Sequence, residues 1–376
     1  MDKVHMSADC SIYLTGYDLD ELTTCLIRFL EENRQKPFRA KQIINWIYNQ
    51  ARTEFSEMDN LPRSLRTLLS ETFSILSLEC LKHLSAKDGA EKFLWMTNDG
   101  LSIESVYMPS IRKATLCLST QVGCPLECAF CATGEVGYWR NLRADEIVTQ
   151  ALAMRSRRRG SAEVSNIVFM GMGEPLLNYD NLGRAIRILN NPALFQIGAR
   201  RITVSTAGIP RGIKRLAKDF PQVKLAVSLN APVDSLRDRL MPINRRYPLR
   251  MLMESVKHFT ETTGKRVTFE YVIIPGVNDS PSLAYSLKKC IDGIPSKLNL
   301  IALNRPCPGA FRAPSAREVK KFQELLMRLL PQPVTLRNSM GEAIQAACGQ
   351  LVGGRVRKKG TVTRAGRRYC GEEAQP

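Results

Sequence analysis

The sequence predicts an α/β fold, in which a partial parallel (β/α)6 barrel follows a small helical N-terminal domain and a linking β-hairpin. From residue 113 onward, short, apolar, β-branched segments alternate with amphipathic stretches, which is typical of parallel strands joined by helical crossovers. Before residue 80, hydrophobic residues instead recur at the spacing of helices. In such a barrel the reactive groups are expected at the carboxyl ends of the strands.

The elements follow in chain order. Domain 1–80 is expected to be helical over 17–80: apolar residues recur at helical spacing from 19 and again from 43, and Pro62 opens a third helix. In 81–112 the period shifts to two around an Asp99–Gly100 turn, which predicts the linking hairpin. The final residues, 355–376, are basic, lack apolar periodicity and are expected to form a flexible tail. The barrel domain, 113–354, has seven strand candidates: 114–120, 166–172, 201–208, 223–229, 267–274, 298–303 and 333–338.

Composition limits the class of protein and its partners. The chain has 376 residues, of which 44% are hydrophobic and 24% charged, as is ordinary for a globular protein. Its net charge of +18 indicates a polyanionic partner such as nucleic acid, although a generic basic surface or a pull toward anionic lipid would give the same charge. No apolar run approaches the roughly 18 residues of a membrane span, and the N-terminus lacks a signal-peptide pattern, so a cytoplasmic location is expected.

Three of the eleven cysteines are clustered in the loop after the first barrel strand, at Cys124, Cys128 and Cys131. Cytoplasmic thiols are kept reduced, so the cluster indicates metal binding rather than a disulfide framework. Thiolates at C-x3-C-x2-C spacing hold zinc or an iron–sulfur cluster. No fourth Cys or His follows within about forty residues, which would leave one metal position open for a substrate. Three buried cysteines without metal are the weaker alternative, because neighbouring thiolates repel one another.

This loop resembles the signature of the radical S-adenosylmethionine superfamily. The stretch 171–175, GMGEP, resembles that superfamily's glycine-rich motif, in which Gly173 and Glu174 would bind the methionine amino group. GMGEPLLNYDN, SLNAP, RLMPIN and AACGQL together resemble the dual-specificity ribosomal and transfer RNA adenine-C2 methyltransferases, over residues 20–354. The resemblance implies a radical SAM barrel, a [4Fe–4S] cluster on the three clustered cysteines, and two S-adenosylmethionine molecules per turnover.

The resemblance also implies a covalent mechanism. Because C2 of adenine is not nucleophilic, ordinary methyl transfer cannot reach it and a radical route is needed. A cysteine matching Cys348 would accept a methyl group from one S-adenosylmethionine, and a radical made from the second would activate that group for addition to C2. Cys117 would resolve the adduct through a transient Cys117–Cys348 disulfide, and Glu104 would accept the proton. Taken singly, Cys117 fits core packing, Glu104 a solvated hairpin position and Cys348 a structural cysteine; as a set they favour the functional interpretation.

Further contacts with S-adenosylmethionine are implied at the strand ends, by Ser205, Ser228, Leu229, Asn230 and Asn304. Each of them, taken singly, would equally well cap a backbone group at a strand end. The family usually has His at the position of Asn230, and Cys307 stands in a loop that usually lacks a cysteine, so Cys307 has no assigned role.

RNA recognition needs a cationic surface and a flipped base, since C2 is unreachable within a stacked helix. The candidate cationic contacts are residues 155–159, residues 245–246 and the basic tail. Tyr138 and Trp139 either stack a base or, more commonly for such a pair, pack the loop onto the barrel.

The partners implied are 23S rRNA and tRNA, with flavodoxin or ferredoxin as electron donor; the chain is expected to be a monomer that binds no membrane. Two alternatives stay open. The sister methyltransferase that modifies C8 of the same ribosomal adenine shares the cluster and both catalytic cysteines, and only residues 175–177 favour C2. A noncatalytic, metal-stabilised RNA-binding protein explains the charge and the cysteine cluster, but not Glu174, Cys117 and Cys348 together.

Overall fold

Seven parallel strands form the centre of the molecule, a computed structural model that describes residues 12–111, 113–158, 163–304, 311–337 and 339–355. All seven predicted barrel strands are confirmed. In the described residues β14 pairs with β13 alone, so the barrel stays open at this edge, as a partial barrel must. In sheet order the strands are β6 (Lys113–Cys117), β9 (Glu163–Phe169), β10 (Ile202–Thr206), β11 (Lys224–Ser228), β12 (Val267–Ile273), β13 (Ser296–Ala302) and β14 (Val334–Arg337).

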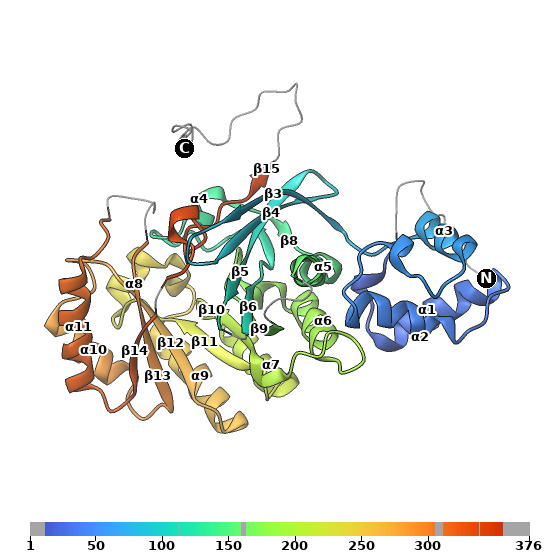
Figure 1. Ribbon diagram of the computed structural model, residues 1–376. Helices are drawn as coiled ribbons and strands as arrows, with labels where there is room; N and C mark the ends of the chain where they lie inside the picture. The colour runs from blue at the N-terminus through green and yellow to red at the C-terminus, as the bar shows by residue number, and fades with distance from the viewer. Residues whose placement is uncertain (1–11, 112, 159–162, 305–310, 338, 356–376) are drawn as a thin grey trace, which may run out of the picture.

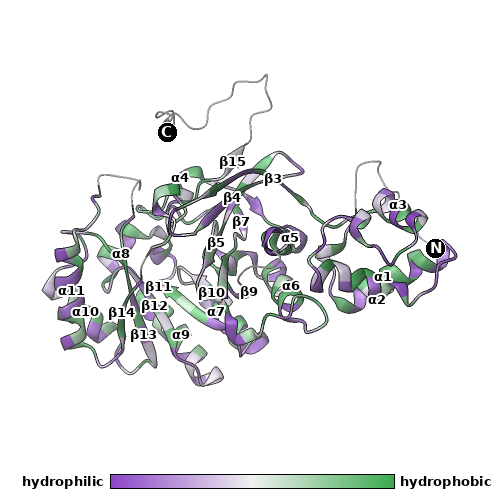
Figure 2. Ribbon diagram, in the orientation of Figure 1, coloured by the Kyte–Doolittle hydropathy of each residue, from purple (hydrophilic) through white to green (hydrophobic). Residues whose placement is uncertain are grey.

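Helices connect successive parallel strands and cover the outside of the sheet (Figure 1). Their sequences are amphipathic: α7, for example, buries Ile213 and Leu216 and exposes Lys214. Figure 2 shows the same division, with mixed colouring on the outer helices and hydrophobic colouring on β11. The helices are α5 (Ala144–Arg157), α6 (Tyr179–Asn190), α7 (Pro210–Asp219), α8 (Asp234–Leu240), α9 (Leu249–Thr263), α10 (Pro281–Cys290) and α11 (Ala316–Leu329).

Antiparallel strands extend the sheet beyond β6. The predicted hairpin is confirmed as β4 (Glu91–Thr97) and β5 (Leu101–Pro109), and in its turn Gly100, at φ 74°, donates its N–H to the Thr97 carbonyl. Because β5 pairs with β6 and β3 (Leu78–Ser85) pairs with β4, the hairpin continues the barrel sheet. The short β15 (Gly354–Arg355) pairs with the start of β5 and brings the chain back over the hairpin.

The N-terminal unit is helical, but less far than predicted. It contains α1 (Leu19–Glu32), α2 (Arg39–Ile44), which a π-helical turn continues to Asn49, and α3 (Arg63–Thr72). The expectation of helix up to residue 80 is wrong beyond Thr72: β2 (Phe73–Ser74) pairs with β1 (Ile12–Tyr13), and β3 joins the sheet.

The helical unit lies beside α5 and α6 (Figure 1). At this contact the buried Thr15 hydroxyl lies 3.2 Å from that of Thr149 on α5. The buried apolar residues of the unit and of the barrel form one continuous cluster, so the two parts share a core.

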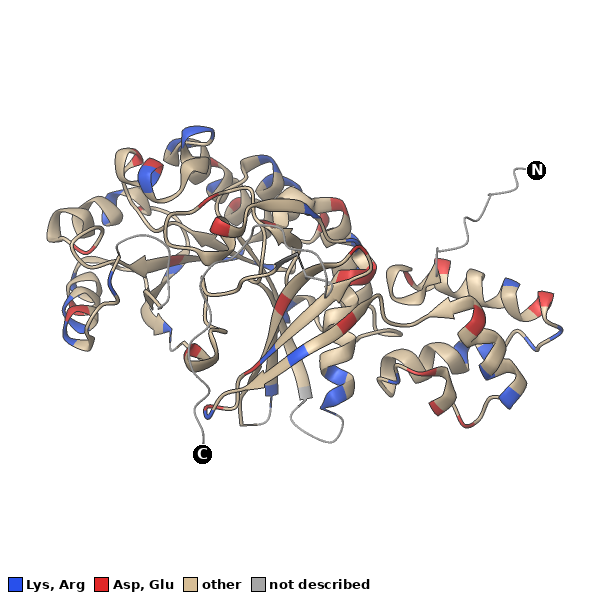
Figure 3. Ribbon diagram, turned by 90° about the horizontal axis from the view of Figure 1, so that it is seen from above, with Lys and Arg blue, Asp and Glu red and all other residues tan. Residues whose placement is uncertain are grey.

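Lys and Arg residues occur on the N-terminal unit and on the outer helices of the barrel (Figure 3). Among the described residues, no helix combines the length and the apolar character needed to cross a membrane. Cys307 and the basic tail beyond Arg355 lie outside the part of the chain that the structure describes.

Candidate active site

A pocket lies at the carboxyl ends of the parallel strands and encloses about 960 Å³, including the space open to solvent. This edge of the sheet is where parallel strands place their binding groups. The ends of β9 to β14, the cysteine loop and the segment after β14 all contribute to its wall. The predicted site residues that line it are Cys124, Cys128, Cys131, Gly173, Glu174, Ser205, Ser228, Asn230, Asn304 and Cys348.

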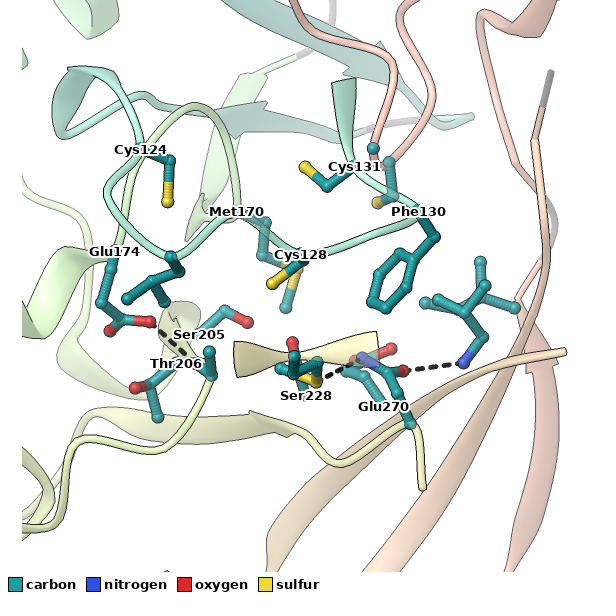
Figure 4. A pocket seen from close by; sticks show the side chains of 18 of the residues that line it. Cys124, Cys128, Phe130, Cys131, Met170, Glu174, Ser205, Thr206, Ser228 and Glu270 are labelled. Atoms are coloured by element: carbon teal, nitrogen blue, oxygen red, sulfur yellow. Dashed lines mark hydrogen bonds between the residues drawn. The ribbon is translucent and has the colours of Figure 1, made fainter. Parts of the chain in front are cut away.

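The three clustered cysteines lie on the cluster loop, residues 124–131, between β7 (Gln121–Gly123) and α4 (Ala132–Val136). They occupy one side of the pocket, and Glu174, Ser205, Thr206 and Ser228 lie across it (Figure 4). The loop begins with a close backbone approach, because a Cβ on Gly123 would meet the Gly137 carbonyl oxygen at 1.6 Å. Its apolar residues Leu126 and Phe130 pack against α8, whose Leu240 carbonyl accepts the N–H of Ala129 at 2.9 Å.

The chemistry of these thiols suits an iron–sulfur cluster. Burial raises the pKa of Cys124 to about 12 and raises the pKa of Cys128 and Cys131 as well, so the thiols ionise only when a bound cation stabilises the thiolates. Among the described residues, no three His, Cys, Asp or Glu side chains converge on a position for a single metal ion. In a [4Fe–4S] cluster each thiolate binds a different iron, so three thiols that line one side of an open pocket fit it.

Glu174 projects from the turn after β9 and is held by backbone donors. Its carboxylate accepts the N–H of Ala207 at 2.7 Å and that of Leu176 at 3.1 Å, and burial raises its pKa to about 7. Gly173 has φ 96°, and a Cβ there would meet Gln121 at 2.5 Å, so this turn requires glycine. The result is a buried carboxylate facing a pocket, which can bind an ammonium group.

Cys348 lies on the Cys348 loop, residues 346–351, which docks directly onto the end of the cluster loop. The Ala132 N–H donates to the Gly349 carbonyl at 2.8 Å, and the Thr133 hydroxyl donates to the Leu351 carbonyl at 2.7 Å. From the end of β13, the Asn304 amide donates to the Cys348 carbonyl at 3.2 Å. A lone thiol from the far end of the chain is thereby brought into the pocket of the three clustered cysteines.

Cys117, at the end of β6, is buried and is not among the residues that line the pocket. Burial, and to a smaller extent an electrostatic interaction with Cys348, raise the pKa of Cys117 to about 12. The two side chains are therefore close enough to interact electrostatically. All cysteines of the described residues are free thiols, so the transient Cys117–Cys348 disulfide is not formed in this structure.

Glu104, on β5, also lies outside the pocket wall, and the alternative of a solvated hairpin position is wrong because only 5% of the residue is exposed. Its carboxylate lies 3.1 Å from the Lys92 ammonium and accepts the Val352 N–H at 2.8 Å. Burial raises its pKa. Through Val352, Glu104 fixes the chain immediately after the Cys348 loop.

Two of the predicted S-adenosylmethionine contacts, Asn230 and Leu229, have side chains that pack or hydrogen-bond within the protein. Asn230 adopts φ 55°, and its side-chain oxygen accepts the Val272 N–H at 2.9 Å, although the residue still lines the pocket. Leu229 is fully buried and is not among the lining residues, so its side chain does not reach the pocket.

Sequence reasoning missed two charged residues of the pocket wall, Glu270 on β12 and Arg337 at the end of β14. One carboxylate oxygen of Glu270 accepts a hydrogen bond from Asn299, and the other has no partner among the described residues. Arg337 interacts electrostatically with Cys348, Glu270 and Cys117. A charged residue inside an otherwise apolar predicted strand was the available signal for both.

Tyr138 and Trp139, on β8 (Tyr138–Asn141), follow the cluster loop and lie on the surface. They are 46% and 44% exposed, so the expectation that such a pair packs the loop onto the barrel is wrong.

Comparisons with known proteins agree with this geometry. The model of the radical SAM superfamily matches residues 118–283, and that of the ribosomal RNA large subunit methyltransferase N-terminal domain matches residues 14–75. The chain is 45% identical to a probable dual-specificity RNA methyltransferase RlmN from Thermotoga neapolitana, over 84% of this chain and 91% of that protein. It is 44% identical to the dual-specificity RNA methyltransferase RlmN of Geobacter sulfurreducens, over 92% and 93% of the two chains. The crystal structure of a radical SAM methyltransferase from Sphaerobacter thermophilus matches with a TM-score of 0.84 and 43% identity, over 90% of this chain and 99% of that one.

Proposed function

Because the chain belongs to the family of dual-specificity RNA methyltransferases, we propose that it methylates C2 of a specific adenosine in 23S rRNA and in tRNA. Membership of the radical SAM superfamily brings a [4Fe–4S] cluster and S-adenosylmethionine as cofactors. The observation that carries the proposal is the docking of the Cys348 loop on the cluster loop, which adds a lone thiol to the pocket. A metal-stabilised binding protein has no use for that thiol, and the dual-specificity relatives disfavour the C8-modifying sister enzyme.

When bound, the reduced cluster supplies the electron that cleaves S-adenosylmethionine, which supplies the radical and the methyl group. The three clustered cysteines would hold the cluster, and the Glu174 carboxylate, placed by the turn at Gly173, would bind the methionine ammonium group. The remaining polar groups of the wall would position the rest of the molecule. These are Ser205, Ser228, Asn230 and Asn304, with Leu229 contributing only its backbone.

Cys348 would carry the methyl carbon and Cys117 would release it. The thiolate is the reactive form of cysteine, so Cys117, whose pKa is raised by burial, would have to lose its proton before it attacks. Attack of the Cys117 sulfur on the Cys348 sulfur then forms a disulfide. The electron pair of the broken bond to Cys348 stays with the carbon attached to adenine, which takes up a proton and becomes the methyl group. Glu104, whose burial raises its pKa, would accept the proton from C2.

The RNA would meet cationic and aromatic groups around the pocket. Tyr138 and Trp139 are exposed beside the cluster loop, where a flipped or unpaired base would stack on them. The helical unit, 1–80, would serve as an RNA-binding accessory domain, joined by 81–112 to the catalytic domain 113–354 and the tail 355–376. A flavodoxin or ferredoxin as electron donor, a monomeric state and a cytoplasmic location without membrane binding belong to the same proposal.

Methylation of both RNAs in vitro tests the proposed function. The anaerobically purified enzyme is incubated with 23S rRNA, tRNA and labelled S-adenosylmethionine, and the methyl position is mapped by mass spectrometry and NMR. We expect label at C2 of one adenosine in each RNA, and none with Cys348→Ala. A methyl group at C8, or label in only one RNA, would contradict the proposal.

A further inference from the structure

Arg237, on α8, is a buried cation with no carboxylate at salt-bridge distance among the described residues. The residue has 0% relative exposure, and within the described part of the chain it forms no salt bridge. Its guanidinium donates only to neutral oxygens. These are the carbonyls of Leu229 at 3.1 Å, Ala207 at 2.5 Å and Ser228 at 3.2 Å, and the side-chain oxygen of Asn244 at 3.0 Å.

The carboxylates nearest in sequence are engaged elsewhere. Asn244 donates its amide N–H groups to Asp234 at 2.9 Å and to Asp238 at 2.7 Å, while its oxygen accepts from Arg237. The amide therefore stands between the guanidinium and both carboxylates. This arrangement accounts for the asparagine of the RLMPIN motif, which the proposed function leaves without a role.

A charge in this position is costly, because burial removes it from water. Asp234 and Asp238 interact with it electrostatically but form no salt bridge with it within the described part of the chain. Burial lowers the pKa of Arg237 to about 10, so the guanidinium remains protonated at neutral pH. Carbonyl dipoles satisfy its hydrogen bonds but leave its net charge in place. The buried guanidinium is therefore suited to stabilise an anionic group that the protein binds in the pocket.

The anion would lie on the pocket side of Arg237. The carbonyls that accept from Arg237 belong to Ala207 and Ser228, whose residues line the pocket, and to the neighbouring Leu229. From the other side, α8 supports the cluster loop through the Leu240 carbonyl, and Arg237 interacts electrostatically with Cys128 of that loop and with Cys290. Arg237 thus lies between the strand ends and the clustered thiols.

The charge of a cluster at these thiols follows from simple arithmetic. Three thiolates around a [4Fe–4S] core of charge +2 give a net charge of −1, and the uptake of one electron makes it −2. A nearby fixed cation stabilises the more negative form, and net charge and local electrostatics set the potential of such clusters.

We propose that Arg237 is the internal counter-ion of the cluster site, which stabilises the reduced cluster and raises its midpoint potential. The inference rests on cluster binding at the three clustered cysteines, not on which base is methylated. Arg237 acts through the cluster and is therefore a positioning residue. The alternative is a purely structural role, in which the hydrogen bonds of Arg237 hold the ends of β10 and β11 against α8 and its charge has no effect on the cluster.

Two substitutions separate charge from hydrogen bonding. Arg237→Lys keeps the charge but loses most of the donors, whereas Arg237→Gln keeps amide donors and loses the charge. Arg239→Gln is the matched control, since it removes the same charge from an exposed position two residues further along α8. The midpoint potential of each reconstituted protein is measured by an EPR-monitored redox titration without S-adenosylmethionine or RNA.

We expect a shift to more negative potential for Arg237→Gln, and potentials close to that of the unsubstituted protein for Arg237→Lys and Arg239→Gln. An unchanged potential in Arg237→Gln, or equal shifts in the Lys and Gln variants, would overturn the proposal. If Arg237→Gln fails to retain the cluster, the iron and sulfide content of the two variants is compared instead. Retention of the cluster by Arg237→Lys would support the role as counter-ion. Equal loss of the cluster from both variants would overturn it and leave a purely structural role. These readouts do not depend on methylation, so the proposed function can fail while this inference stands.

Discussion

The two loops that bring cysteines into the pocket are held in place by different forces. The cluster loop buries Leu126 and Phe130 against α8, so hydrophobic packing fixes it. The Cys348 loop buries the smaller Ala346 together with Leu351, and polar groups from other elements anchor it as well, among them Thr133, Asn304 and, just beyond the loop, Glu104. Hydrophobic packing resists the loss of a single contact, whereas a polar anchor depends on one donor or acceptor. Changes to these anchors should therefore disturb the methyl-carrying thiol and spare the cluster.

The largest expected effect separates the two loops by iron content. Cys128→Ala removes a cluster ligand, so we expect loss of iron and of all RNA methylation. Cys348→Ala removes only the proposed methyl carrier, so we expect full iron content and no methylation. Iron and sulfide analysis beside the labelled methylation assay checks both. Normal turnover by either variant would refute its assigned role.

Cys117→Ala should stop the reaction later than Cys348→Ala. Without the resolving thiol, the carbon stays bonded to Cys348 after it has reached adenine, so protein and RNA should remain covalently linked. The measurement is a slow-migrating, ribonuclease-sensitive band on a denaturing gel, with the Cys117→Ala/Cys348→Ala double variant as control. Normal methylation without that band would reduce Cys117 to a core residue.

Lys92→Met tests the anchor behind the Cys348 loop. Lys92 and Glu104 are both almost fully buried, so removal of the ammonium leaves an uncompensated carboxylate and should lower the free energy of unfolding by about 3–5 kcal/mol. Urea unfolding of the apoprotein measures this loss. Lys82→Met, at an exposed position on β3, should stay within about 0.5 kcal/mol of the parent protein.

The same loss should depend on pH in a defined direction. The pKa of Glu104 is raised by burial, so the folded protein binds that proton more tightly than the unfolded chain does. In Lys92→Met the penalty should be present at neutral pH and should shrink as the pH falls and Glu104 becomes neutral. Lys92→Met combined with Glu104→Gln should recover most of the stability at neutral pH. A loss that is independent of pH would place its cause in packing rather than charge.

The smallest expected effect is that of Thr133→Val, which removes the hydroxyl that donates to the Leu351 carbonyl. We expect a local cost of about 1 kcal/mol, seen as faster amide hydrogen exchange around residues 349–352, with the iron content unchanged. Thr133→Ser keeps the hydroxyl and should exchange like the parent protein. Equal acceleration in the cluster loop would show that the two loops move as one unit.

The sequence by itself determined the seven parallel strands, the hairpin turn and the position of the three clustered cysteines. Each of these depends on neighbouring residues: alternation of apolar segments, an Asp-Gly turn, or ligand spacing within one loop. The error beyond Thr72 has a related cause, because whether a short segment joins a helix or a sheet is decided by the strand beside which it lies. For residues 78–85 that strand is β4.

Only the tertiary structure decided which charges are buried and what they face. In the segment DSLRDRL, which has four charged residues, the fold encloses Arg237 and leaves Arg239 exposed. From the sequence, Glu104 was likewise a possible surface residue, but in the structure Lys92 and Val352, just after the Cys348 loop, contact its carboxylate. The physical reason is that burial and hydrogen-bond partners depend on groups far apart in the chain, and local patterns carry no information about those groups.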